Sequence, residues 1–306
     1  MKKHYKKLLI LIFSLLVIHL VSINIGPRFI IQVNKGVYSL FVQPDPRTAE
    51  KPEMYLLAAE TLTIQTEDNL RIKGFLIKSQ AEKVKGTIVL VHGIRAGKEH
   101  FFKVCKLLSD NGYNSVIFDL RAHGESQGDY CTYGFHEKKD ITILLNQLSS
   151  RNDISHNFGI WGQSLGGAIS LQVMARDQRI KFGIVESAFS EMRKIVHDYF
   201  RMNAGFDIPV ITNYMLTRAE SIASFDAEQV WPARSARLIT RPVMLVHGSK
   251  DDRIKPEYAQ ENFAALSSTC KYFVEIENAG HLDVWEKGGE RYFSDVIRFM
   301  DKYINS

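Results

Sequence analysis

The sequence predicts an α/β fold with a mostly parallel sheet of eight strands and helices on its faces. Short, nearly continuous apolar runs recur between residues 87 and 276, and such runs are typical of strands buried on both faces of a parallel sheet. The intervals between the runs are long enough for crossover helices. A pair of alternating segments precedes the runs and predicts an antiparallel hairpin that opens the sheet.

The first 25 residues predict a membrane anchor. Residues 1–7 form a basic tail, and residues 8–25 form an uncharged apolar run. Such a run spans about 27 Å as a helix, close to the hydrocarbon thickness of a bilayer. The lysines of the tail predict a single-pass orientation with the N-terminus in the cytoplasm and the body on the extracytoplasmic side. A cleaved signal peptide followed by secretion is the alternative, and a soluble chain is a weaker one.

The net charge of +5 resides mostly in that tail. Four of the charges are lysines of the first seven residues, and the rest of the chain is nearly neutral. A neutral body has no electrostatic reason to bind nucleic acid, so we expect no nucleic-acid partner.

The composition is that of an ordinary globular protein. Hydrophobic residues make up 45% of the 306 residues and charged residues 24%, which excludes a disordered chain, a collagen-like fibre and a multi-span transporter. The three cysteines are too few for a disulfide scaffold. We expect them to be free, or one pair with one left over.

Residues 26–60 form a lead-in to the body. Its apolar side chains either lie along the membrane surface or pack under the body; they are Phe29, Ile30, Ile31, Val33, Val37, Leu40 and Phe41. The body, residues 61–306, starts with the hairpin of residues 61–66 and 70–78. Further strands are expected at 87–91, 115–120, 158–161, 182–185, 243–246 and 272–276, and helices at 101–108, 140–148 and 168–175.

One interval, residues 190–241, is longer than a single crossover needs. Its aromatic residues are Phe200, Phe206, Tyr214, Phe225 and Trp231. An aromatic-rich insertion above a sheet is a candidate lid over a binding site. Two ordinary helices with an apolar core face are the alternative.

The strongest motif is G-x-S-x-G at residues 162–166, centred on Ser164. A predicted strand precedes it and a predicted helix follows, which is the context of a nucleophile elbow. The glycines permit the sharp turn that raises the serine hydroxyl above the sheet edge.

A serine nucleophile needs a base and a carboxylate that orients the base. Asp251 follows the predicted strand 243–246, and His281 follows the predicted strand 272–276. Because the carboxyl ends of parallel strands meet at one edge, we expect both side chains near Ser164. The loop after strand 87–91 is expected to place the backbone N–H of Ile94 beside that of Leu165, and this pair would form an oxyanion hole.

Together these motifs resemble the serine hydrolases of the α/β-hydrolase superfamily, most of all the monoglyceride lipase/serine aminopeptidase-like group and its membrane-anchored relatives. The shared motifs are V-H-G at 91–93, F-D-L-R-A-H-G-E-S at 118–126, G-Q-S-L-G-G at 162–167, H-G-S-K-D at 247–251 and G-H at 280–281. The resemblance covers residues 61–306 and implies an α/β-hydrolase fold with a Ser-His-Asp triad. Members usually carry glycine where this chain has Ala122. The superfamily hosts many reactions, so the substrate does not follow from it.

Rival residues exist for the acid of the triad. Asp252 competes with Asp251, but the family spacing of four residues after His247 favours Asp251. Glu186 ends the predicted strand 182–185 and is a rival acid, although we expect a helix-capping or lid contact there. We expect His92 and His247 to pack beside the elbow.

One further motif resembles a metal site. Residues 136–140 read H-E-K-K-D, similar to the zinc motif H-E-x-x-H but with Asp140 at the last position. No further ligand cluster accompanies it, so we expect an ordinary helix start with acidic residues in its first turn. His123, in the turn after strand 115–120, is expected to be structural.

The sequence therefore predicts a serine hydrolase that cleaves a carboxylic ester or thioester through an acyl-enzyme intermediate. The anchor and the aromatic insertion favour a small-molecule or lipid-like acyl substrate. A serine peptidase of the prolyl/aminopeptidase type is the alternative, and a non-catalytic binding module is a weaker one. No metal or organic cofactor is expected, and the sequence does not predict an oligomeric state.

Overall fold

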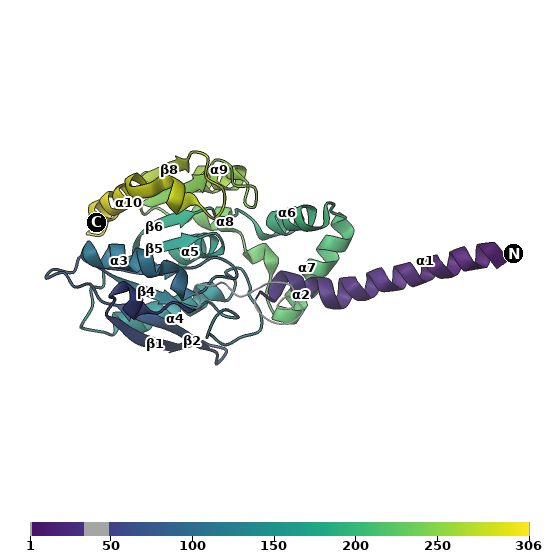
Figure 1. Cartoon of the computed structure of the whole chain (residues 1–306), viewed down its shortest axis with the longest axis horizontal. Coiled ribbons are helices and arrows are strands. Elements are labelled where there is room, and N and C mark those ends of the chain that lie inside the picture. The colour runs from purple at the N-terminus through teal and green to yellow at the C-terminus, as the bar shows by residue number, and fades with distance from the viewer. Residues whose placement is uncertain (1, 34–48, 306) are drawn as a thin grey trace.

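A computed structural model describes residues 2–33 and 49–305. Eight strands form one sheet in the order β1-β2-β4-β3-β5-β6-β7-β8 (Figure 1). The strands are β1 (Ala59–Gln65), β2 (Arg71–Ile77), β3 (Gly86–Val91), β4 (Tyr113–Phe118), β5 (Phe158–Gln163), β6 (Ile180–Glu186), β7 (Val243–Gly248) and β8 (Lys271–Ile276). The predicted α/β fold with a mostly parallel eight-stranded sheet is confirmed.

Most neighbouring strands run parallel, and four of the central strands are buried throughout. β2 pairs antiparallel with β1 and with β4, and every other neighbouring pair is parallel. All residues of β3, β4, β5 and β7 are buried. A strand covered on both faces is apolar at successive positions, which is why these segments read as continuous apolar runs. β1 alternates between buried and exposed side chains over its last four residues, because only one of its faces is covered.

Helices cover both faces of the sheet. On one face, α3 (Phe102–Asp110) and α10 (Val284–Tyr303) pack over Ile88 and Leu90 of β3. On the other face, Val89 and Val91 belong to the cluster that includes α4 (Glu137–Ser149), α5 (Leu165–Arg176), α8 (Pro232–Ala236) and α9 (Pro256–Ala265). Alternate residues of one strand thus enter opposite clusters.

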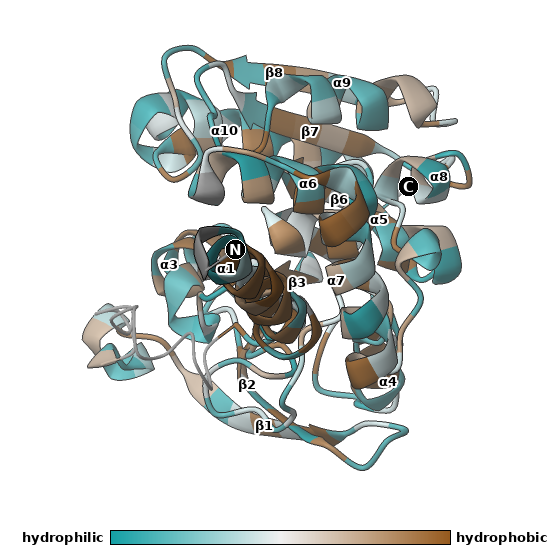
Figure 2. Cartoon of the chain, turned by 90° about the vertical axis from the view of Figure 1, so that its right-hand side faces the viewer, coloured by the Kyte–Doolittle hydropathy of each residue, from teal (hydrophilic) through white to brown (hydrophobic). Residues whose placement is uncertain are grey.

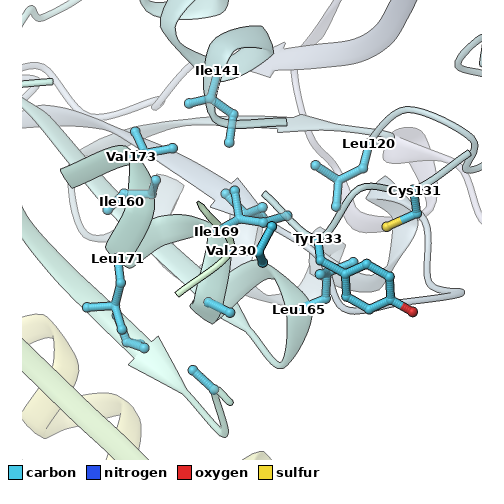
Figure 3. Close-up of a cluster of buried hydrophobic side chains, with 14 of the residues drawn as sticks. Leu120, Cys131, Tyr133, Ile141, Ile160, Leu165, Ile169, Leu171, Val173 and Val230 are labelled. Carbon is cyan, nitrogen blue, oxygen red and sulfur yellow. The ribbon is translucent and has the colours of Figure 1, made fainter. Parts of the chain in front are cut away.

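The helix that follows β5 lies in the centre of this second cluster. Leu165, Ile169 and Val173 of α5 lie among apolar side chains from β5 and α4, including Ile160 and Ile141 (Figure 3). Ten of its twelve residues are buried. The first turn of α5 is therefore held firmly below the carboxyl end of β5.

The long interval between β6 and β7 contains further helices. They are α6 (Met192–Ala204), α7 (Pro209–Ala223), a 3₁₀ turn at Ala227–Gln229 and α8. Helices α6 and α7 stand out from the body on the side from which the N-terminal helix projects (Figure 1).

The chain starts with a long helix. α1 (Lys2–Leu20) continues through a π-helical turn, Val21–Ile25, into α2 (Gly26–Ile31). The stretch His4–Ile31 is long and apolar enough to cross a membrane, by length and composition. α1 projects from the body and its described side chains are exposed (Figures 1 and 2).

The described part of the lead-in packs on the body. Ile30, Ile31 and Val33 are buried. The carbonyl oxygen of Ile31 accepts the backbone N–H of Cys131 at 2.9 Å, and that of Ile30 accepts the Tyr133 hydroxyl at 2.6 Å. The structure thus places these side chains under the body, whereas Phe29 is 41% exposed. Val37, Leu40 and Phe41 lie outside the described residues. All three cysteines are free.

Candidate active site

Ser164 occupies the sharp turn between β5 and α5. Its backbone has φ 56° and ψ −118°, a conformation that non-glycine residues rarely adopt. Its N–H donates to the carbonyl oxygen of Glu186 at 2.8 Å. A Cβ at Gly162 would overlap the backbone of Gly166, and a Cβ at Gly166 would overlap the backbone of Val91. Glycine at both positions is therefore what allows the turn to close.

The structure brings Ser164, His281 and Asp251 together at the carboxyl edge of the sheet. His281 Nε2 lies 2.9 Å from Ser164 Oγ, and His281 Nδ1 lies 2.8 Å from Asp251 Oδ2. An ionised carboxylate only accepts hydrogen bonds, so Nδ1 carries the proton and Nε2 is free to accept from the serine hydroxyl. All three side chains are less than 10% exposed.

The surroundings of Asp251 keep it ionised. Burial opposes ionisation, but hydrogen bonds from His281 and from the backbone N–H of Ile254 outweigh it and hold the pKa of Asp251 below its usual value. The backbone N–H of Arg253 donates to the same carboxylate at 3.0 Å. Asp252 is exposed. Of the two neighbouring aspartates, the structure therefore places Asp251 against the imidazole.

The loop after β3 lies against the serine. A Cβ at Gly93 would lie 3.3 Å from Ser164 Cβ, so the backbone that leads into Ile94 runs directly beside the elbow. Leu165, the other expected donor, is the first residue of α5. The amino end of a helix carries unpaired N–H groups and a partial positive charge, which favour an anion beside Ser164.

Two buried histidines support this loop. His92 Nδ1 donates to the carbonyl oxygen of Gly93 at 2.7 Å, and its Nε2 accepts the backbone N–H of Leu120 at 2.9 Å. Burial lowers the pKa of His92 to about 4 and that of His123 to about 3. Both rings are therefore neutral near pH 7, and they pack together with centroids 4.9 Å apart. Next to His123, Ala122 adopts φ 63°, the left-handed backbone for which glycine is suited.

The expected roles of Glu186 as a helix cap or lid contact are wrong. Its buried carboxylate accepts the indole N–H of Trp161 at 2.7 Å and of Trp285 at 2.9 Å, and the hydroxyl of Tyr292. The carboxylate also bonds the side chain of Gln163, the residue before Ser164.

That cluster, defined here as the Glu186 network, extends to the loop after β3. His100 Nε2 lies 2.5 Å from Gln163 Oε1, and the His100 ring stacks on Trp285 with centroids 4.8 Å apart. The network thus joins β5, β6, α10 and the 3₁₀ turn Lys98–Phe101 directly behind the elbow. Sequence reasoning missed it, because most of its members are far apart along the chain and only Gln163 belongs to a short motif.

The remaining candidate ligands are engaged elsewhere. His136 Nε2 lies 2.9 Å from the carbonyl oxygen of Ser224, and Glu137 accepts two bonds from Thr132. Asp140 forms a bidentate pair with Arg121. Within residues 2–33 and 49–305 we find no group of three or more His, Cys, Asp or Glu residues that could hold a metal ion. His247 Nε2 donates to the carbonyl oxygen of Ile254 and lies 3.4 Å from Asp251 Oδ2.

Helix α6 carries Tyr199, a half-buried residue that packs against the hydrophobic core. Burial raises the pKa of its Tyr199, and the positive charges of Arg95 and Arg253 oppose that shift while Asp251 adds to it. Arg95 follows Ile94 in the loop after β3, and Arg253 follows Asp251 by two residues. Tyr199, Arg95 and Arg253 lie outside the motifs by which the sequence points to a site.

A polar contact fastens α6 to the body. Asp198 accepts the Tyr258 hydroxyl at 2.7 Å and the ammonium group of Lys255 at 2.9 Å. Lys255 directly precedes α9 and Tyr258 lies in its first turn, after the loop of Asp251. This contact, the Asp198 latch, joins α6 to the start of α9.

Comparison with known proteins supports the resemblance read from the sequence. A model of the serine aminopeptidase family, S33, matches residues 82–206. The alpha/beta hydrolase domain-containing protein WAV2 of Arabidopsis thaliana is 25% identical over 263 residues, 82% of each chain. An uncharacterized membrane protein of Saccharomyces cerevisiae is 22% identical over 87% of each chain.

Solved structures confirm the α/β-hydrolase fold. The esterase Pf2001 of Pyrococcus furiosus superposes with a TM-score of 0.70 at 22% identity, over 84% of this chain and 95% of that one. An acylaminoacyl peptidase of Pyrococcus horikoshii superposes with a TM-score of 0.63 at 18% identity, over 81% of this chain and 42% of the peptidase. These likenesses establish the shared fold.

Proposed function

We propose that this protein, an α/β-hydrolase resembling the serine aminopeptidase-like group, is a membrane-anchored serine hydrolase that cleaves a carboxylic ester or thioester. The observation that carries the proposal is the continuous chain of contacts from Ser164 Oγ through His281 to Asp251. Buried groups in this order are what a nucleophilic serine requires. A binding-only protein has no need of an aligned base and carboxylate.

In the proposed reaction, Ser164 Oγ attacks the acyl carbonyl while His281 Nε2 takes the hydroxyl proton. The backbone amides of Ile94 and Leu165 stabilise the oxyanion, and each such donor is worth about 3–4 kcal/mol of the barrier. His281 then gives the proton to the leaving alcohol or thiol, and the acyl group remains on Ser164. Water, activated by the same imidazole, attacks the acyl-enzyme and releases the acid. Asp251 holds the imidazole tautomer and stabilises the imidazolium.

The charges near the site favour an ester over an amino-terminal peptide. An aminopeptidase binds the ammonium group of its substrate, which acidic side chains favour and cationic ones oppose. Arg95 directly follows Ile94, and Arg253 lies two residues after Asp251, whose carboxylate is engaged by His281. The name of the matching family and the peptidase neighbour keep peptide hydrolysis as the second candidate.

The N-terminal helix supports the membrane part of the proposal. Its length, its apolar composition and the lysines before it suit a single-pass anchor with the N-terminus in the cytoplasm and the body outside. A relative named as a membrane protein agrees with anchoring. An anchored enzyme with an aromatic insertion suits a lipid-like acyl substrate.

Labelling by a fluorophosphonate probe tests the proposed chemistry. The full-length chain in membranes is expected to react with the probe, and Ser164→Ala is expected to abolish labelling. Ser150→Ala, at an exposed serine after α4, serves as the matched control and should label fully. Undiminished labelling of Ser164→Ala would exclude Ser164 as the nucleophile.

Substrate class is tested by comparing kcat/KM for esters of increasing acyl length with kcat/KM for aminoacyl anilides. The proposal expects esters to be preferred and longer acyl chains to raise kcat/KM. A preference for anilides with a free amino group would favour the peptidase reading.

A further inference from the structure

We propose that the turn between α6 and α7 is a membrane-docking surface, which sets the catalytic edge of the sheet against the bilayer that holds the anchor. This turn, residues 202–214, is called the docking turn below. The inference rests on the anchored part of the proposed function, and its partner is a lipid surface. It implies that substrate reaches Ser164 from the membrane side of the molecule.

The anchor is joined firmly to the body, so its direction fixes how the body faces the bilayer. α2 packs on α7 so closely that a Cβ at Gly26 would overlap the side chain of Met215. Two carbonyl oxygens of α2 accept bonds from Cys131 and Tyr133. A helix held by packing and by two such bonds does not swivel freely on the body.

The anchor leaves on the side of the docking turn. Figure 1 shows α1 projecting past the corner where α6 meets α7. Figure 2, which faces the end of the anchor, shows α6 and α7 beside α1 on the face turned to the viewer. The residues at which the anchor enters the body, Val21–Ile25, also contact α7. A bilayer crossed by α1 therefore begins beside this turn.

The side chains of the docking turn are those of a surface that enters an apolar medium. Phe206 is 64% exposed, Ile208 48% and Val210 80%. In the described parts of the chain, ten large apolar residues beyond the N-terminal helix are exposed, and five of them fall within residues 202–214. Such a concentration marks an interaction surface rather than scattered surface apolar residues.

The charge at the tip of the turn is turned inward. The Asp207 side chain is only 2% exposed and accepts the Thr212 hydroxyl at 2.7 Å. Its other oxygen lies 2.9 Å from His197 Nδ1 and 3.4 Å from Arg201. The tip thus presents apolar groups outward and keeps its carboxylate satisfied, as insertion among lipid headgroups and acyl chains requires.

Depth-dependent quenching tests the docking turn directly. The full-length chain carries Cys270→Ser, which leaves the buried Cys105 and Cys131, and one new cysteine labelled with an environment-sensitive NBD group. Val210→Cys reports on the turn. Leu238→Cys is the matched control, because Leu238 is 66% exposed but precedes β7, at the end of the strand away from Asp251.

The protein is placed in phosphatidylcholine vesicles that contain doxyl-labelled lipid. The emission of the NBD label at position 210 is expected to shift to shorter wavelength and to be quenched by the doxyl lipid. The emission of the label at position 238 is expected to show neither change. The same emission wavelength and the same quenching at positions 210 and 238 would overturn the proposal. A blue shift at 210 without quenching by the lipid would overturn it as well, since that result indicates a second copy of the chain over the turn. Because the measurement needs no turnover, it gives an answer even if Ser164 proves inactive.

Turnover supplies a second, separate readout. Val210→Asp is expected to lower kcat/KM for a long-chain ester embedded in vesicles by about ten-fold, since a charge opposes insertion. The same substitution should leave kcat/KM for a soluble short-chain ester unchanged. The control Leu238→Asp should leave kcat/KM unchanged for both esters. Equal rates of Val210→Asp and wild type on the embedded ester would contradict the proposal, whereas loss of all ester hydrolysis in the wild type would instead refute the proposed function.

Discussion

His281 Nε2 lies 2.9 Å from Ser164 Oγ, although 117 positions separate the two residues in the chain. The serine stands at the end of β5 and the histidine after β8, three places along the sheet. The contact exists because parallel strands deliver their carboxyl ends to one edge.

Removing the charge of Asp251 should reduce the rate without dismantling the site. In Asp251→Asn, His281 loses the partner that selects its tautomer, so kcat should fall by about 10⁴-fold. Steady-state kinetics with a soluble ester measures the loss. Asp252→Asn is the matched control at the exposed neighbour and should stay near the wild-type rate. Similar losses in both variants would count against the assignment of Asp251.

The Glu186 network should affect stability more than a surface carboxylate does. Glu186→Gln puts an amide among the N–H and O–H donors of Trp161, Trp285 and Tyr292 and leaves buried groups unpaired, at a cost of about 1–3 kcal/mol. Chemical denaturation should detect the loss. Glu286→Gln, at an exposed glutamate of α10, should change the free energy of unfolding by less than about 0.5 kcal/mol. An unchanged midpoint in Glu186→Gln would show that the network contributes little.

Acid should destabilise the protein through its buried histidines. The pKa of His92 is lowered to about 4 and that of His123 to about 3, against 6.5 for an unperturbed ring. Between pH 6.5 and 4 the unfolded chain therefore binds more protons than the folded one, so stability falls as the pH falls. The loss approaches roughly 3 kcal/mol for each histidine.

Denaturation curves between pH 7 and 4 measure this slope. His92→Gln, which cannot take up a proton, should flatten it relative to wild type. An identical slope in the variant would mean that His92 is not responsible.

Loosening the Asp198 latch should alter substrate handling and spare the nucleophile. In Asp198→Ala, α6 loses its contacts with Tyr258 and Lys255, so KM for a long-chain ester should rise by several-fold while probe labelling of Ser164 persists. Asp295→Ala, which removes a surface pair with Arg298, is the control. Loss of labelling in Asp198→Ala would place the latch in the support of the triad itself.

The fold was predictable from the sequence because its central strands are covered on both faces. β3, β4, β5 and β7 are wholly buried, so each appears as a short apolar run. The elbow was equally visible, since its glycines and serine are neighbours in the chain. The buried strands and the turn at Ser164 can therefore be predicted from short stretches of sequence.

Other features depend on partners that local sequence does not reveal. Ile30 and Ile31 are apolar whether lipid or protein covers them, so the sequence does not distinguish a membrane-surface position from packing under the body. The contacts of α2 with Cys131, Tyr133 and α7 show that these residues pack under the body. Glu186 reads as a lone carboxylate at a strand end. Its indole and hydroxyl donors lie 25 to 106 positions away, so its role emerged only in three dimensions.

Intact-protein and peptide mass spectrometry after fluorophosphonate treatment tests the central claim most directly. The account predicts one adduct per chain, carried by the peptide that contains Ser164 and lost when His281 is replaced by alanine. An adduct on a different serine, or no adduct on a folded full-length chain, would contradict it.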